Sequence, residues 1–68
     1  MLNKEEGIII EYDGYIGKIK TVDKEYLLQK KNIKNNQELK VGDTVSFLGE
    51  EVLLIDGIGY IATFVDVI

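Results

Sequence analysis

The chain has 68 residues, 46% of them hydrophobic, which allows one domain with a thin margin of stability. It contains no cysteine and no histidine, so disulfides are excluded and a zinc site would need carboxylates alone. No apolar run nears the ~20 residues that span a bilayer, and residues 1–6 lack the features of a signal peptide. We expect a single cytoplasmic domain over residues 1–68, without metal or membrane contact.

The net charge of −4 is unevenly distributed. Residues 18–40 hold seven of the eight lysines and three acids, whereas residues 41–68 hold five acids and no base. All eight cations are lysine, so the two-pronged phosphate contact of arginine is missing. The pattern fits either a basic face on an acidic body or ordinary solvated surface charge.

Three strands are predicted in the first half of the chain. Residues 8–12 are β-branched and aromatic, and the turn pair Asp13-Gly14 follows them. Residues 15–22 and 25–30 alternate with period two, which is typical of strands with one face inward. The side chains expected to point inward are Tyr15, Gly17, Ile19, Tyr26 and Leu28. Those expected on the opposite, outer side include Ile16, Lys18, Lys20, Leu27 and Gln29.

A polar connection and a fourth strand follow. Residues 31–38 are too polar for a core, and we interpret them as a loop or short helical turn anchored by Ile33. A bend at residues 39–43 then leads into the fourth strand at residues 44–48. The side chains of this strand expected in the core are Val45 and Phe47.

The last part of the chain is predicted to be strand as well. Gly49-Glu50-Glu51 breaks the fourth strand, and residues 52–55 extend the sheet beyond the break. After a turn at residues 56–59, the final strand covers residues 60–68. Its two aromatic residues, Tyr60 and Phe64, are expected on the same face of the strand. They are interpreted as core residues or as residues that close the end of the barrel, or one of them is an exposed anchor.

These short strands predict an all-β fold, a small five-stranded antiparallel barrel. Glycines recur every few residues between β-branched stretches, which excludes a mainly helical chain. Closure into a barrel removes exposed strand edges. An SH3-like barrel has a similar strand count, but the long polar segment at residues 31–38 favours the OB-fold, which has a long connection there.

A family resemblance lies in the order of the framework residues. A glycine comes first, before a strand that contains β-branched residues and an aromatic residue. A second glycine lies within an alternating segment, and a later glycine precedes a strand that contains an aromatic residue. The last strand contains an alanine. The segments are residues 7–12, 16–19, 25–33, 39–47 and 62–65. Over residues 7–67 the chain resembles the cold-shock domain family. The resemblance implies a cold-shock-like OB barrel that binds single-stranded RNA or DNA.

The chain departs from this family at the positions that stack on bases. The family's aromatic platform is replaced here by Glu11, Ile16, Lys18, Leu27, Gln29 and Lys30. Stacking contributes ~1–3 kcal/mol per base, so the loss of the platform removes several powers of ten in affinity. The usual binding mechanism of the family is therefore not expected.

Two non-catalytic functions are considered for the outer face: nucleic-acid binding is the leading prediction, and protein binding is the alternative. Weak, salt-sensitive binding of single-stranded nucleic acid would use Lys18, Lys20, Gln29, Lys30, Lys31 and Lys34. An alternative interpretation is that these lysines only keep a β-rich protein soluble, since lysine commonly protects strand faces and edges. Binding of a protein partner, or of a second copy as a homodimer, would use Ile8, Ile10, Ile16 and Leu27. A register shifted by one residue would instead bury these aliphatic side chains.

Catalysis is not expected. Without histidine or cysteine, the hydroxyl groups have no recognisable base. The acid pairs Glu5-Glu6 and Glu50-Glu51 would point to opposite faces of a strand. Residues 57–59 are not followed by a helix or by a Lys-Ser/Thr pair, so they are not a phosphate loop. No cofactor is predicted.

Overall fold

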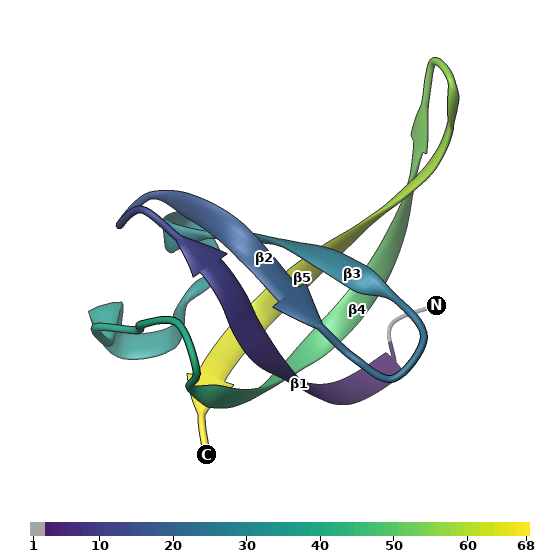
Figure 1. Ribbon diagram of the computed structural model, residues 1–68. Coiled ribbons are helices and arrows are strands. Elements are labelled where there is room, and N and C mark those ends of the chain that lie inside the picture. Colours follow the sequence, from purple (N-terminus) through teal and green to yellow (C-terminus); the bar gives the residue numbers. More distant parts are fainter. Residues whose placement is uncertain (1–2) are drawn as a thin grey trace.

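Five strands curl into a closed barrel in the computed structural model, which describes residues 3–68 (Figure 1). They are β1 (Asn3–Tyr12), β2 (Ile16–Lys20), β3 (Glu25–Gln29), β4 (Thr44–Leu54) and β5 (Gly57–Val67). Their order around the barrel is β1-β2-β3-β5-β4, and pairing of β4 with β1 closes it. All neighbours run antiparallel apart from β3 and β5, which run parallel. The predicted all-β, five-stranded OB-type barrel is confirmed.

The core is formed by alternate residues of the strands, as the period of two requires. In β2 and β3 the predicted inward residues Gly17, Ile19, Tyr26 and Leu28 are all buried. The predicted inward residues of β4 are buried too, and the Phe47 ring meets the Tyr26 ring edge-on at 4.9 Å between centroids. The full set of buried hydrophobic residues is Ile9, Ile19, Tyr26, Leu28, Ile33, Leu39, Val45, Phe47, Ala62 and Val65.

The prediction that Tyr15 points inward is wrong. This residue lies in the turn between β1 and β2 and is 72% exposed. The Asp13 carboxylate accepts hydrogen bonds from the backbone N–H groups of Tyr15 (2.9 Å) and Ile16 (2.8 Å). These bonds hold Tyr15 in the turn, outside the alternation of β2. They also lower the pKa of Asp13, since they favour its ionised form.

The polar connection between β3 and β4 contains two single 3₁₀ turns, η1 (Lys30–Asn32) and η2 (Lys34–Asn36). Ile33 lies between them, is buried and forms an isolated parallel bridge with Val65, so its predicted role as anchor is confirmed. Further along, the Gln37 side chain donates to Asp66 at 2.9 Å and accepts from the Val67 backbone at 3.1 Å. The connection is therefore fixed against β5.

The predicted break in the fourth strand is wrong, because β4 continues from Thr44 to Leu54. Gly49 remains within the strand and lies against the Tyr26 ring: a Cβ atom there would be 2.8 Å from Tyr26 Cε2. The strand and its partner β5 then leave the barrel together as a long hairpin, which projects beyond the other strands (Figure 1). We call residues 51–60 of this hairpin the arm.

A bulge in β5 separates the two aromatic residues expected on one face. The register with β4 shifts between Ser46 and Leu48, and Phe64 has a φ of 52°, in the left-handed region that bulky residues rarely adopt. The residues on both sides of the bulge, Ala62 and Val65, therefore both point inward. Tyr60 packs against the core, whereas Phe64 is 59% exposed.

Candidate interaction face

The outer side of the first three strands carries the residues singled out in the sequence. We call it the β1–β2–β3 face; its side chains from paired positions are Ile8, Glu11, Ile16, Lys18, Lys20, Glu25, Leu27 and Gln29. Directly opposed residues of neighbouring antiparallel strands point to the same side, so these side chains are neighbours. Gly17 and Ile19, which lie between the β2 members, are buried. The predicted register of β2 and β3 is thereby confirmed.

A bulge in β1 adds one more aliphatic residue to the face. Ile9 pairs with Ile19 and Glu11 pairs with Lys18, which leaves Ile10 as the extra residue. Both Ile10 and Glu11 consequently point outward, while Ile9 points into the core. The next residue, Tyr12, is half-buried; its hydroxyl donates to the Gly14 carbonyl at 3.1 Å.

Exposed aliphatic side chains form the middle of the face. Ile8 and Ile16 are about half exposed, Ile10 slightly less, and Leu27 is partly buried. Two shallow grooves run between them. One is lined by Ile8, Ile10 and Val22, and the other by Ile10, Ile16, Leu27 and Val41. The structure therefore brings together all four residues predicted for protein interaction and joins Val22 and Val41 to them.

Each lysine of the face is opposed by an acid. Lys18 lies between Glu11 of β1 and Leu27 of β3, and Lys20 lies between Ile8 of β1 and Glu25 of β3. Cross-strand pairs of opposite charge attract, and each of these lysines has an acid at the directly opposed position of a neighbouring strand. The centre of the face consequently carries no excess positive charge, and its apolar character dominates.

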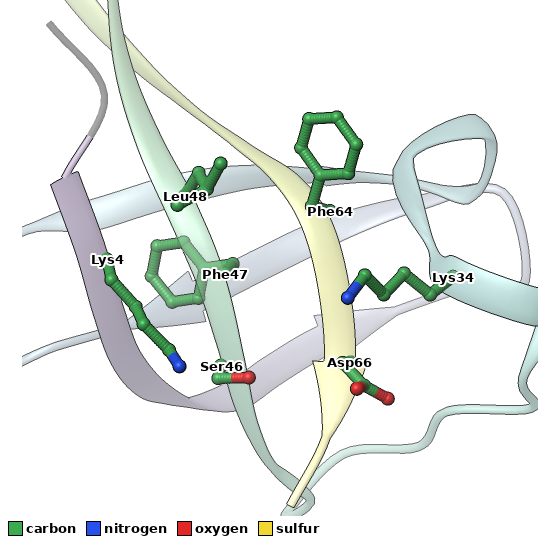
Figure 2. A pocket seen from close by; sticks show the side chains of 7 residues that line it. All are labelled: Lys4, Lys34, Ser46, Phe47, Leu48, Phe64 and Asp66. Carbon is green, nitrogen blue, oxygen red and sulfur yellow. The ribbon is translucent and has the colours of Figure 1, made fainter.

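The six residues predicted to bind nucleic acid do not form one cluster. Lys18, Lys20 and Gln29 belong to the β1–β2–β3 face. Lys30 lies at its end, where its Nζ atom is 5.3 Å from the centre of the Tyr15 ring. Lys31 and Lys34 instead line grooves beside Phe64, over β4 and β5. Figure 2 shows Lys34 and Phe64 at one of these grooves, together with Lys4 at its other side.

Sequence reasoning missed Tyr15 as an exposed aromatic residue, and it left open which of Tyr60 and Phe64 would be exposed, because both outcomes depend on backbone geometry that interrupts the alternation. For Tyr15, the signal was the Asp13-Gly14 pair directly before it, which ends the strand register. For Phe64, no sequence signal marked the bulge: glycine or asparagine is the usual residue at positive φ.

Within residues 3–68, no group of three or more acidic residues is arranged to hold a metal ion. The same part of the chain has no helix with the length and apolar character needed to cross a bilayer. The prediction about the N-terminal segment also concerns Met1 and Leu2, which lie outside the described residues. Comparison with models of known protein families and with curated proteins finds no match for this chain, so the cold-shock family resemblance stays a prediction.

Proposed function

We propose that this chain is a non-catalytic protein-binding domain whose β1–β2–β3 face docks an apolar segment of a partner protein in the cytoplasm. The observation that supports this most is the cluster of exposed aliphatic side chains over two adjoining grooves, centred on Ile10. Contiguous exposed apolar side chains rimmed by polar ones are typical of protein interaction sites.

The energetics favour a partner with an apolar side chain of its own. Full burial of an isoleucine contributes roughly 1.5–3 kcal/mol, so covering the exposed parts of Ile8, Ile10 and Ile16 supplies a few kcal/mol. Lys18 and Lys20 keep their charged ends in solvent, while their hydrocarbon stems extend the apolar surface. Because Glu11 and Glu25 are opposed to these lysines, a partner segment needs no strong charge of its own to bind this face.

A site-specific photo-crosslinker tests this proposal. With benzoylphenylalanine in place of Ile16, we expect one defined protein adduct in an extract of the source cells. The same group in place of the exposed Lys34 is the control and should not give this adduct. The partner, identified by mass spectrometry and purified, should lose at least tenfold in affinity for an Ile10→Glu variant, since burying an unpaired carboxylate opposes docking. Equal adducts from both positions, or none, would contradict the proposal.

Single-stranded nucleic acid is a second candidate ligand, favoured by one observation. Tyr15 presents an exposed ring at the end of the face, and the Lys30 ammonium lies beside it. A ring next to a cation offers a base a stacking surface and its phosphate a counter-charge. A single stacked base contributes ~1–3 kcal/mol, which makes this binding weak.

A titration of the labelled protein with an oligothymidine tests the second candidate. At low salt we expect amide shifts at Tyr15, Ile16 and Lys30 that vanish at moderate salt, because phosphate contacts release counterions. Tyr15→Ala should abolish the shifts at Ile16, whereas removal of the distant aromatic in Phe64→Ala should leave them unchanged. Shifts spread evenly over the lysines, without Tyr15, would refute a stacking site.

A further inference from the structure

The two grooves of the β1–β2–β3 face meet at Ile10 and continue along β1 in both directions. One groove reaches back to Glu6, and the other reaches forward to Asp13 in the turn after the strand. A strand rises about 3.3 Å per residue, so with one residue taken up by the bulge these ends lie roughly 20 Å apart. Between them, Ile8 and Ile9 are hydrogen-bonded or paired on both edges of β1. A ligand that covers both grooves therefore contacts side chains and does not add as a further strand.

The charges along the grooves leave an excess of acid at the two ends. Each of the two lysines of the face lies opposite an acid on a neighbouring strand. The remaining charged residues of the two linings are both acids, Glu6 and Asp13. Glu6 is opposed on β4 by the uncharged Ser46, and Lys4, two positions before it, lines a different groove beside Phe64. The chain as a whole has a net charge of −4, so its field also favours a cationic ligand.

The carboxylate at the Asp13 end is held in place before any ligand binds. The backbone N–H groups of Tyr15 and Ile16 both donate to its Oδ1 atom, which leaves Oδ2 for a ligand. Those bonds favour the ionised form and lower the pKa of Asp13, so the charge is present throughout the neutral range. A cation that meets this carboxylate does not have to order it first, which reduces the entropic cost of the contact.

We propose that the segment docked on this face is extended and carries two aliphatic side chains at alternate positions, with a lysine or arginine two positions before and after them. The aliphatic side chains fill the grooves on either side of Ile10, and the cations meet Glu6 and Asp13. An extended segment rises by the same amount per residue as β1, so about seven residues span the two acids. This inference rests on the proposed function, because it names the chemistry of the partner at the same face.

A chemical-shift titration of the labelled chain at low ionic strength tests the inference. The probe is the blocked peptide Lys-Ser-Ile-Ser-Ile-Ser-Lys, and we expect it to shift the amides of Ile10 and Ile16. A peptide with glutamate at both ends should bind about tenfold more weakly or less, because like charges then meet. The double variant Glu6→Gln/Asp13→Asn should bind the lysine peptide about three- to tenfold more weakly, the effect of two exposed ion pairs.

The matched control removes the same two charges from the arm. Glu51→Gln/Asp56→Asn changes exposed acids outside the face and should bind the lysine peptide like the wild type. Asparagine at position 13 keeps the Oδ1 acceptor of the turn. Circular dichroism checks the fold of each variant, and Glu6→Gln alone replaces the first double variant if that protein unfolds.

The outcomes separate this inference from the proposed function. If a peptide with serine at both ends binds as tightly as the lysine peptide, the basic ends are overturned, whereas the proposed apolar docking is supported. Equal losses in the two double variants also overturn the pairing with Glu6 and Asp13, because net charge alone then explains them. If no peptide shifts Ile10 or Ile16, the extended segment is overturned, and the Ile16 photo-adduct decides the proposed function separately.

Discussion

Alanine at position 17 is expected to remove most of the stability of the barrel. A Cβ atom on Gly17 would overlap the carbonyl oxygen of Glu11 and lie 2.8 Å from the Tyr12 Cα atom. Both obstacles are backbone, so β1 itself must move, and β1 closes the barrel by pairing with β2 and β4. Overpacking of this kind costs about 3 kcal/mol or more. A domain of this size has only about 3–10 kcal/mol in total.

Urea unfolding followed by circular dichroism measures this loss. Gly59→Ala is the matched control, because it is the same substitution within a strand. There the nearest obstacle is the end of the exposed, flexible Leu54 side chain, which can rotate away. We expect the control to change the unfolding free energy by less than about 1 kcal/mol. A Gly17→Ala protein as stable as the control would show that β1 does not approach β2 this closely.

Truncation of Phe47 to alanine is expected to be nearly as damaging. Phe47 is almost fully buried, and its ring contacts Tyr26, whose ring in turn meets Tyr60 at 5.6 Å between centroids. Removal of a buried phenylalanine costs about 3–5 kcal/mol through lost transfer free energy and the cavity left behind. In a 68-residue chain without disulfides this leaves little net stability, so a large unfolded fraction is expected at room temperature.

The same substitution at the exposed aromatic residue is the control. Phe64→Ala removes a ring that is mostly in solvent, so we expect a change below about 1 kcal/mol. Thermal unfolding followed by circular dichroism compares the two variants at equal concentration. Equal losses at both positions would mean that the aromatic cluster around Tyr26 is not the centre of the core.

The sequence allowed the register of β2 and β3 to be predicted because their alternation is unbroken. Charged or polar residues alternate with apolar ones around Ile19 and Leu28, which leaves one arrangement that buries these two side chains while keeping the charges in water. The same logic identified Val45 and Phe47 as core. The polar connection was also predictable, since only Ile33 among its residues is suited to burial.

The remaining differences arise where tertiary contacts override local signals. Gly49 would normally interrupt a strand, but here it provides room for the Tyr26 ring, and β4 continues. The β5 bulge changes the alternation and turns Phe64 outward. The arm could not be recognised as exposed, because Val52 to Ile55 have the composition of a buried strand.

For the candidate face, the sequence identified the aliphatic residues but not their electrostatic surroundings. Ile8, Ile10, Ile16 and Leu27 follow from strand position alone. The opposition of Lys18 to Glu11 depends on the extra residue in β1, which shifts the pairing by one position. Lysines that are near one another in sequence, such as Lys30 and Lys31, separate because η1 turns the chain between them.

The position of β5 between β3 and β4 has a consequence for folding during protein synthesis. The β1–β2–β3 meander leaves the ribosome first, but β5, which pairs with β3, is the last of the five strands to be made. Long-range pairing of this kind is slow and cannot begin before both partners exist. The nascent chain therefore exposes the inner side chains of its first three strands until Val67 has left the exit tunnel.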